Sequence, residues 1–561
     1  MFLLMDSEYQ ARLQQFKSKP LDGLALKKLV EAGLAWLKAN QATVNALNVF
    51  PVPDGDTGTN MVLTMQAAYS EINDLGQRHI GQMAQAISQG ALMGARGNSG
   101  VILSQIWRGF ARSLHDQQVM DGPAMVKALA DARDTAYKGV VRPVEGTILT
   151  VIKDVATAAQ NALTETQDPF EILELLIPAA DASVEHTPEL LPVLKQAGVV
   201  DSGGKGLFYI LEGMLRYMHG EPLDSALVTI QPLAAMNLEN SLTAIEPGQD
   251  YEIVVDFKPA QALDTKKFYS ELENIGTSIQ LGEGEGMYRM HIHVPTENRY
   301  LPIEYVMSVG TVTKVAMENL LAQMDEIGRA TESDHIELTP IEPGQIAVVA
   351  VSPGKGVSRV FASLGVAALV EGGQTMNPST QEILNAFENL PTDRVIILPN
   401  NKNIILAAQA AREVTVKKVH IVPSRTIPQG LAAMMHLNLE GDLDQVVKKM
   451  NRALEEVTTG EITVATRTVD IEGVSVEKDH VIALMNGSLI CSAENIESAV
   501  MAFLEKASAA DFELVTLFYG QDLPFSEANR ITDLVRTTYP ALEVELQDGG
   551  QPHYQFIISV E

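Results

Sequence analysis

The stretch Asn48-Val-Phe-Pro-Val-Pro-Asp-Gly-Asp-Thr-Gly-Thr-Asn-Met61 brings two aspartates, two glycines, two threonines and an amide together within a few residues. Asp54 and Asp56 stand two apart on a tight turn, so their carboxylates can converge on one cation, and hard oxygen ligands suit Mg²⁺. The glycines let the backbone approach a phosphate, while threonine hydroxyls and N–H groups supply hydrogen bonds. The stretch predicts a metal–phosphate site. The alternative is a solvated Asp-Gly turn.

Three further glycine-rich connections follow, and each precedes an apolar helical pattern. They are Gly90-Ala-Leu-Met-Gly-Ala-Arg-Gly-Asn-Ser-Gly100, Val144-Glu-Gly-Thr147 and Gly198-Val-Val-Asp-Ser-Gly-Gly-Lys-Gly206. A flexible loop that opens a helix directs backbone N–H groups at an anion, although none of these loops is a P-loop or a dinucleotide fingerprint. Each one alone could be a plain helix–helix connection. Because alternate loops of an up-and-down bundle lie at the same end, the loops together predict one shared site.

Residues from about 5 to 220 resemble the ATP-binding domain of the dihydroxyacetone-kinase family, and they are most similar to the large, ATP-binding subunit of bacterial fatty-acid kinases. The motifs that carry the resemblance are residues 45–61, 94–100 and 198–206. It continues through residues 371–380 and 398–404 and covers essentially the whole chain. The resemblance implies a barrel of antiparallel helices in which Mg²⁺ ions lie between aspartates and the phosphates of ATP.

The resemblance also implies roles for individual residues. Asp54 and Asp56 are the expected catalytic and Mg²⁺-binding carboxylates. Asn48, or else Asn45, stands where related dihydroxyacetone kinases carry another aspartate, so Asn48 is a further expected Mg²⁺ ligand. Hydroxyls, amides and glycines are expected to hold ATP: Thr57, Gly58, Thr59, Asn60, Asn98 and Ser99 at the phosphates, and Thr147, Asp201, Ser202 and Gly203 along the nucleotide pocket.

By resemblance, the phosphoryl acceptor is the carboxylate of a fatty acid presented by a separate fatty-acid-binding protein, and the product is an acyl phosphate for phospholipid synthesis. Phosphoryl transfer needs mainly positioning and charge neutralisation. A carboxylate is already ionised at neutral pH, so no general base is required. Two alternatives stay open. One is a dihydroxyacetone-type kinase acting on a small hydroxylated substrate, and the other is a nucleotide-binding regulatory scaffold.

The composition indicates a globular protein of several domains. The chain has 561 residues, of which 46% are hydrophobic. Its formal net charge of −30 repels nucleic acid phosphates and anionic lipid headgroups, so neither partner is expected. The one cysteine, Cys491, excludes an internal disulfide. Because the sequence shows neither a signal peptide nor an apolar run long enough to span a membrane, we expect a cytoplasmic enzyme without a transmembrane segment. We further expect a homodimer.

Hydrophobic periodicity divides the chain into three regions. Residues 1–220 are expected to be all-α, because apolar residues recur at helical spacing, as in Leu24, Leu26, Leu29, Val30, Leu34 and Leu37. By resemblance, these helices form an antiparallel barrel that binds ATP and Mg²⁺. Residues 240–328 predict a small α+β domain. Its expected strands are 250–257 and 287–294, and its expected helices are 265–275 and 311–324.

Residues 344–561 predict a C-terminal α/β domain with a largely parallel sheet, since short β runs at 346–351, 394–398 and 419–422 alternate with helical segments. By resemblance, this domain has a docking role and is similar to part of the separate fatty-acid-binding protein. Polar loops at residues 375–380 and 399–402 follow probable strands, where ligands of parallel sheets bind. The alternative is that their Asn, Ser and Thr residues cap helices.

The middle domain contains a second candidate site, the pair His291 and His293. Residues i and i+2 of a strand face the same side, so both imidazoles can reach one metal. Asp250 begins the other main strand and stands where the resembling family commonly has a cysteine associated with zinc. A zinc site of His291, His293 and Asp250 is therefore one interpretation. The other is a pair of exposed histidines on a sheet.

Overall fold

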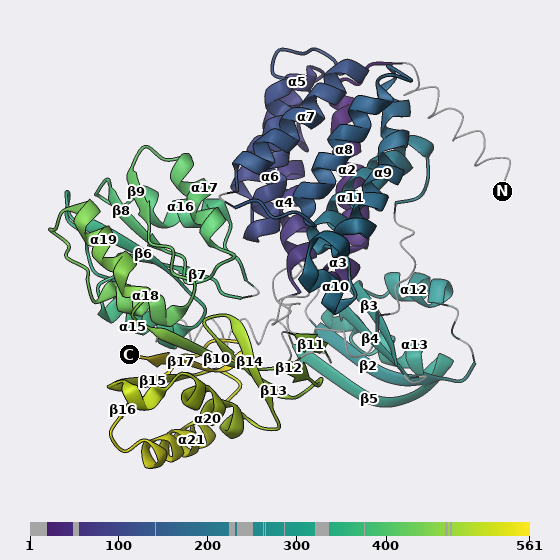
Figure 1. Ribbon diagram of the computed structural model, residues 1–561. Helices are drawn as coiled ribbons and strands as arrows, with labels where there is room; N and C mark the ends of the chain where they lie inside the picture. The colour runs from purple at the N-terminus through teal and green to yellow at the C-terminus, as the bar shows by residue number, and fades with distance from the viewer. Residues whose placement is uncertain are drawn as a thin grey trace. The chain divides into compact units, whose positions relative to one another are not determined.

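The N-terminal region is built entirely from helices in the computed structural model, which describes residues 19–48, 55–140, 142–223, 231–232, 251–261, 263, 265–284, 287–319, 336–374, 376–465, 469–471 and 474–561. The helices in this region are α2 (Gly23–Ala39), α3 (Gln41–Leu47), α4 (Thr57–Ile72), α5 (Ile80–Met93), α6 (Gly97–Ser113), α7 (Gly122–Lys138), α8 (Ile148–Ala162), α9 (Pro169–Leu190), α10 (Pro192–Ala197) and α11 (Ser202–His219) (Figure 1).

The long helices of this region close into a ring. Helix α2 packs on α4, each helix from α4 to α9 packs on the next, α9 packs on α11, and α11 returns to α2. The sequence explains how α2 takes part. Asp22 caps it by accepting a hydrogen bond from the N–H of Ala25, and Leu26, Leu29 and Leu37 are buried on one face. The predicted all-α character is confirmed for the described residues, and the cyclic packing is consistent with a helix barrel.

The middle region carries a five-stranded sheet in the order β1-β3-β4-β2-β5. Its elements are β1 (Gln231–Pro232), β2 (Tyr251–Pro259), α12 (Thr265–Glu273), β3 (Thr277–Gly284), β4 (Met287–Val294), α13 (Leu301–Val309) and β5 (Gly310–Asn319). Strand β2 lies between β4 and β5 and is antiparallel to both. The expected strands and the helix near 265–275 are confirmed.

The prediction of a helix at residues 311–324 is wrong for residues 311–319, and residues 320–324 lie outside the described residues. Residues 310–319 form the edge strand β5, and the helix of this part is α13, which ends before it. The β-branched residues Thr311, Val312, Thr313 and Val315 favour an extended backbone, because two heavy atoms on Cβ restrict the side chain in a helix.

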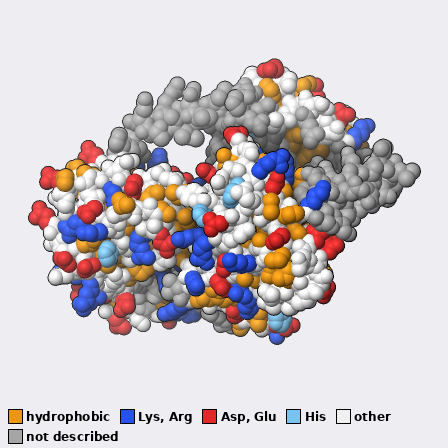
Figure 2. Space-filling view, turned by 90° about the horizontal axis from the view of Figure 1, so that it is seen from above, with side chains coloured by type: hydrophobic (Ala, Val, Ile, Leu, Met, Phe, Trp, Pro, Cys, Tyr) orange, Lys and Arg blue, Asp and Glu red, His pale blue; other side chains and the backbone are white. Residues whose placement is uncertain are grey.

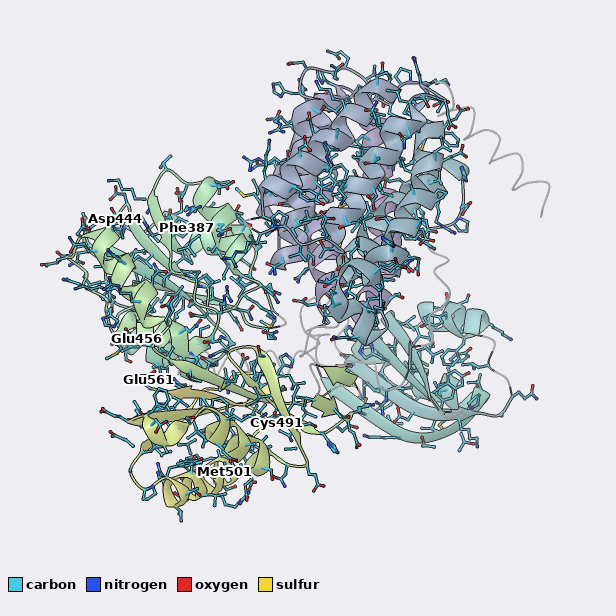
Figure 3. The ribbon with its side chains drawn as sticks, in the orientation of Figure 1. Phe387, Asp444, Glu456, Cys491, Met501 and Glu561 are labelled. Carbon is cyan, nitrogen blue, oxygen red and sulfur yellow. The ribbon has the colours of Figure 1, made fainter. Side chains whose placement is uncertain are left out.

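The C-terminal region begins with a four-stranded sheet in the order β7-β6-β8-β9, in which every pairing is parallel. Its elements are β6 (Ile346–Ser352), α15 (Lys355–Ser363), β7 (Ala368–Glu371), α16 (Thr380–Glu388), β8 (Arg394–Leu398), α17 (Ile405–Glu413), β9 (Lys418–Ile421), α18 (Ile427–Met434) and α19 (Leu443–Ala453). Alternate residues of β6 join two different cores. Val348 belongs to a cluster with residues of α15 and α18, and Val349 to one that includes the buried Phe387 of α16 (Figure 3). Helices therefore cover both faces of this sheet.

The second C-terminal sheet corrects the prediction of a largely parallel domain. Its six strands run β14-β13-β10-β17-β15-β16, and only the pairing of β15 with β16 is parallel. This part contains β10 (Thr458–Val464), β11 (Val469–Ile471), β12 (Val474–Val476), β13 (Val481–Met485), β14 (Ser488–Ala493), α20 (Ile496–Lys506), β15 (Leu514–Tyr519), α21 (Phe525–Thr538), β16 (Glu543–Asp548) and β17 (Tyr554–Val560).

A tight Asn-Gly turn explains the antiparallel pairing of β13 and β14. Asn486 and Gly487 both have positive φ, 52° and 83°, as a two-residue hairpin requires. Residues 481–493 therefore form two strands that this turn joins. Cys491 lies on β14, where it is half-buried and burial raises the pKa of its thiol (Figure 3).

The chain divides into two compact units, Met1–Asp224 with Glu337–Glu561, and Ser225–Ile336. On the face shown in Figure 2, Lys and Arg side chains are interspersed with Asp and Glu, so the net charge of −30 does not form a uniform acidic layer there. No helix within the described residues is both long and apolar enough to cross a bilayer.

Candidate functional site

Asp56 is held at the start of α4 in an unusual way. It occupies the N-cap position but makes no side-chain hydrogen bond to its own helix, and it is only 7% exposed. Its Oδ2 accepts a hydrogen bond from Nδ2 of Asn377 at 2.5 Å, and its Oδ1 lies 3.4 Å from Nδ2 of Asn48. The carboxylate is therefore almost buried, and amide groups from outside α4 contact both of its oxygens.

The first turns of α4, α8 and α11 are tied together by side chains. The Ser202 hydroxyl donates to Oγ1 of Thr57 at 3.2 Å, which links α11 to α4. The Asp201 carboxylate accepts hydrogen bonds from the backbone N–H groups of Gly204, in its own helix, and of Ile148, which begins α8. One aspartate therefore joins two helix N-termini.

Helix α6 begins next to α4. The backbone N–H of Arg96 lies 3.4 Å from Oγ1 of Thr64. Gly97 has φ of +57°, and a Cβ at this position would lie 2.5 Å from Nδ2 of Asn60. Only glycine fits this close approach without strain. The N-termini of α4, α6, α8 and α11 therefore gather at one end of the ring, and their positive ends favour a polyanion there.

Thr59 faces a neighbouring helix. Its Oγ1 accepts hydrogen bonds from Nε2 of Gln41 at 2.9 Å and from Nδ2 of Asn45 at 3.1 Å, and its backbone N–H donates to Oδ1 of Asn45. These bonds tie α3 to α4. Asn45 thus contacts Thr59, whereas Asn48 is the asparagine that reaches Asp56.

The remaining predicted residues lie on the same helix starts, with one exception. Asp54 lies outside the described residues. Thr147 is the N-cap of α8, where its hydroxyl accepts from the N–H of Leu149. Asn98 and Ser99 lie half-buried in the first turn of α6. Gly203 is buried in the first turn of α11, where a Cβ would lie 3.3 Å from Ile148. The structure therefore brings those residues predicted for the ATP and Mg²⁺ site that it describes into one region.

Asp201 has an altered acidity. Burial raises the pKa of its carboxyl to about 6 from an ordinary value of 3.8, although the N–H groups of Gly204 and Ile148 act in the opposite direction. A carboxyl with this pKa titrates close to neutral pH. A helix-capping aspartate at a solvated surface would not show this raised pKa, because water would stabilise its charged form.

The two cations near these loops are engaged with other groups. The Arg96 guanidinium lies 3.0 Å from the Glu382 carboxylate and donates to the backbone carbonyl of Asn377 at 2.9 Å. Lys205 Nζ lies 3.1 Å from Oδ1 of Asp181 and over the ring of Phe208.

Sequence reasoning missed Asn377. It comes from the loop between β7 and α16, is 2% exposed, and reaches Asp56 across 321 residues of sequence. The sequence of the loop at residues 375–380 has two interpretations, binding of a ligand or partner and capping of a helix, and each describes part of the loop. Ser379 caps α16 in a capping box with Glu382, while Asn377 contacts the helical region.

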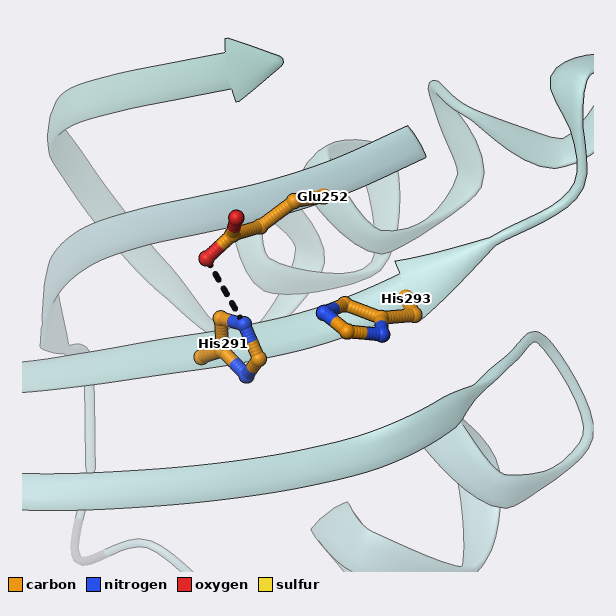
Figure 4. A group of neighbouring side chains, drawn as sticks. All are labelled: Glu252, His291 and His293. Atoms are coloured by element: carbon orange, nitrogen blue, oxygen red, sulfur yellow. Dashed lines mark ion pairs between the residues drawn. The ribbon is translucent and has the colours of Figure 1, made fainter. Parts of the chain in front are cut away.

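The middle unit contains a separate buried cluster of Glu252, His291 and His293 (Figure 4). Oε1 of Glu252 lies 2.8 Å from Nε2 of His291, and the two imidazole rings are 4.9 Å apart. One ligand atom from each residue lies within 4.8 Å of the others. This donor set suits a transition metal such as zinc.

The cluster rules out the interpretation of exposed histidines and adds a carboxylate that the sequence analysis did not name, while the role predicted for Asp250 stays a prediction. His291 and His293 are 1% and 2% exposed, so they are not surface histidines. The carboxylate that meets them belongs to Glu252, which pairs with His293 in the register of β2 and β4. Asp250 lies outside the described residues. Positions 250 and 252 share a face in an extended strand, which is why the alternation could not choose between them.

Some solved structures resemble parts of the chain at low similarity. They include the dihydroxyacetone kinase from C. freundii in complex with AMP-PNP and Mg²⁺ (21% identity, TM-score 0.28, 36% of this chain and 35% of that chain). The Streptococcus pneumoniae Fatty Acid Kinase (Fak) B3 protein loaded with linoleic acid is another (12%, 0.26, 33% and 76%). The fatty acid binding protein DegV from Bacillus subtilis is a third (13%, 0.30, 38% and 98%). Likenesses at this level carry no argument about this chain.

Sequence families and relatives cover nearly the whole chain. Residues 51–216 match the DAK2 domain, residues 246–327 the middle domain of FakA-like fatty acid kinase proteins, and residues 347–561 the C-terminal domain of the same proteins. Protein YloV of Bacillus subtilis is 36% identical over 97% of this chain and 100% of its own length. An uncharacterized protein of Staphylococcus aureus (strain USA300) is 35% identical over 96% and 99%. The chain therefore belongs to the FakA-like family of fatty acid kinase proteins.

Proposed function

We propose that this chain is the ATP-binding component of a fatty acid kinase, which transfers the γ-phosphoryl group of ATP to a fatty-acid carboxylate held by a separate lipid-binding protein. The observation that carries the proposal is the buried Asp56 carboxylate, which lies at the start of α4 where the N-termini of α4, α6, α8 and α11 gather. Membership of the FakA-like family supports the choice of acceptor.

The described residues fit a Mg²⁺–nucleotide complex. Asp56 provides a hard anionic oxygen, and Asn48 brings an amide next to it. The side-chain Oδ1 of Asn377 is buried and has no hydrogen-bond partner in the part of the chain that the structure describes. A buried amide oxygen without a partner is costly, and a hydrated cation beside Asp56 would satisfy it. In this proposal Asp54 joins Asp56 as a second carboxylate.

The chain's own residues would then position the reactants. When bound, Mg²⁺ would neutralise charge on the phosphates. In the first turns of α4 and α6, Thr57, Gly58, Asn60, Asn98 and Ser99 would donate hydrogen bonds to phosphate oxygens. Thr59, which bonds to Gln41 and Asn45, would hold this turn of α4 against α3. Thr147 and the segment from Asp201 to Gly203, which the structure ties to α4 and α8, would line the nucleotide pocket.

The transfer itself needs no proton acceptor. An oxygen of the fatty-acid carboxylate forms a bond to the γ-phosphorus, the bond from that phosphorus to the bridging oxygen of ADP breaks, and an acyl phosphate and ADP result. A small hydroxylated substrate would instead have to lose a proton during the reaction. Asp201, whose pKa burial raises to about 6, already accepts backbone hydrogen bonds at the starts of α8 and α11.

A coupled assay tests the proposal. Purified full-length chain, Mg²⁺, ATP and a fatty-acid-loaded binding protein should yield ADP and acyl phosphate, and Asp56→Asn should reduce the rate at least a hundredfold, on the order expected when a preorganised charge is removed. Phosphorylation of dihydroxyacetone with none of a protein-bound fatty acid would refute the acceptor. ATP binding without turnover on either acceptor would favour a regulatory scaffold.

A second candidate site follows from the middle unit. We infer that Glu252, His291 and His293 bind one transition-metal ion, with zinc the first choice, since two imidazoles and a carboxylate form a known zinc ligand set. In this proposal the ion supports the small sheet and is not assigned a step in phosphoryl transfer. Elemental analysis of the purified protein tests it. Metal content well below one ion per chain after growth with zinc would overturn it.

A further inference from the structure

The C-terminal α/β region contacts the candidate site through a defined seam. Arg96 donates to the carbonyl of Asn377 and pairs with Glu382, and the N–H of Thr380 donates to the carbonyl of Ala95 at 3.2 Å. Beside these polar contacts, Ala95 and Val101 of the helical region belong to the same buried cluster as residues of α16 and α17. The seam therefore has both hydrogen bonds and an apolar core.

Asn377 is fixed by the start of α16. Pro378 follows it and limits its backbone, and Ser379 then caps the helix in a reciprocal bond with Glu382. Burial raises the pKa of Glu382, but the backbone N–H of Ser379 and the Arg96 guanidinium outweigh it, so the net pKa lies below the ordinary value. Glu382 thus stays ionised at neutral pH and keeps Arg96 in place.

The choice of an amide at this position has an electrostatic consequence. A lysine or arginine touching Asp56 would cancel the charge that attracts Mg²⁺ and would repel the ion. The Nδ2 group of Asn377 orients the same carboxylate without adding charge. Arg96, the nearby guanidinium, is directed instead to Glu382 and to a carbonyl. A second amide pair, Nδ2 of Asn98 with Oδ1 of Asn403 at 3.1 Å, joins the same two regions.

We propose that Asn377 is a positioning residue for Asp56, supplied by the C-terminal region, so that Mg²⁺–nucleotide binding in the helical region and docking of the C-terminal region stabilise each other. Carboxylates that bind metals are oriented by hydrogen-bond partners behind them, and loss of such a partner typically costs 10–100-fold in affinity. Because the two events share one contact, the coupling is reciprocal. This inference rests on the proposed function.

The test is a Mg²⁺ titration of the full-length chain with a fluorescent ADP analogue. Asn377→Ala and Asn377→Leu both remove the amide, but leucine retains the side-chain volume. Both should raise the Mg²⁺ concentration for half-saturation about tenfold, with full binding recovered at high Mg²⁺. The matched control is Glu413→Ala, which removes the Arg108–Glu413 pair between the same regions without touching Asp56, and it should leave the titration unchanged.

Three results separate the explanations. If Asp56→Asn weakens Mg²⁺-dependent binding and the Asn377 variants do not, the inference fails and the proposed function stands. If Asp56→Asn has no effect, the metal site itself is misplaced. A change in the alanine variant alone would reflect a cavity and would also overturn the inference. In the Asp56→Asn background, Asn377→Leu should add no further loss, since the carboxylate it positions is absent.

Hydrogen exchange tests the coupling separately from nucleotide affinity, because it measures the protection of backbone amides in the seam. In the wild-type chain, Mg²⁺ and the ADP analogue should slow exchange of backbone amides at residues 376–382, because the seam is stabilised by binding. In Asn377→Leu this protection should be lost even at Mg²⁺ concentrations that saturate the site. Equal protection in both proteins would contradict the coupling.

Discussion

Replacing Gly58 with alanine should destabilise the helical region. Gly58 lies in the first turn of α4, where the chain passes close to α3. A Cβ added here would lie 2.5 Å from the backbone carbonyl oxygen of Gln41, 2.8 Å from Oδ1 of Asn45 and 3.2 Å from Cβ of Val44. Because the nearest of these atoms is backbone, the two helices must separate for alanine to fit.

The expected magnitude follows from two opposing effects. Overpacking of this kind costs about 1–3 kcal/mol, while alanine gains at most about 1 kcal/mol over glycine in a helix. With a cost in the middle of that range, about 2 kcal/mol, the net loss is about 1–2 kcal/mol in the free energy of unfolding. For a region of this size, such a loss lowers the melting temperature by about 2–8 °C. The separation also pulls Asn45 away from Thr59. At present Nδ2 of Asn45 donates to Oγ1 of Thr59, and Oδ1 of Asn45 accepts from the backbone N–H of Thr59.

Tryptophan fluorescence isolates this effect from the rest of a multidomain chain. The sequence has two tryptophans, Trp36 on α2 and Trp107 on α6, and both are buried in the helical region. Their emission therefore reports on that region alone. Gly76→Ala is the matched control, since a Cβ there meets nothing within 4 Å. A Gly58→Ala melting temperature equal to or above that of the wild type would refute the close approach of α3 and α4.

Three other changes have defined outcomes. Asp201→Asn should remove a pH dependence of stability. The pKa of Asp201 is raised to about 6 in the folded protein from 3.8, so the stability of the wild type falls as pH rises from about 4 to 7, by about 3 kcal/mol at most. Tryptophan melts across that range should show the melting temperature of the variant rising relative to that of the wild type. Glu252→Gln should lower the zinc content of the purified protein by elemental analysis while tryptophan melting stays unchanged, because the middle unit holds neither tryptophan. Gly97→Ala puts a residue with a Cβ in the left-handed region, at φ of +57°, where the new methyl group would push on Asn60. Nucleotide affinity measured by titration should therefore fall at least tenfold. An affinity equal to that of the wild type would show that this loop does not approach the phosphates.

Local sequence patterns were sufficient to predict the helix N-termini that build the site. The helical period, the glycine-rich loops and the capping residues predicted a shared end for α4, α6, α8 and α11, because each signal lies within a few residues of the element that it marks. The parallel sheet from β6 to β9 was predicted for the same reason. The capping role of Ser379 was also readable, since a capping box spans only four residues.

The incorrect or missing predictions concern residues whose deciding contact is far away in sequence, or segments in which two sequence patterns compete. The apolar run at residues 311–319 fits a helical spacing, but its β-branched residues favour a strand, and pairing with β2 settled the outcome. The Asn486-Gly487 turn was overlooked, and with it the antiparallel character of the second C-terminal sheet. Asn377 gives no local sign that it meets Asp56, because a contact across 321 residues leaves no periodic signal.

That sequence separation has a consequence for how the protein is made. The helices of the N-terminal region pack mostly on their neighbours in sequence, so they can fold while later residues are still being synthesised. At about 5–20 residues per second, Asp56 emerges from the ribosome roughly 15–60 s before Asn377 does. A nascent chain would therefore complete its helical ring well before the contact with the C-terminal region can form. Ribosome-bound chains ending near residue 260 offer a way to observe the ring before that contact exists.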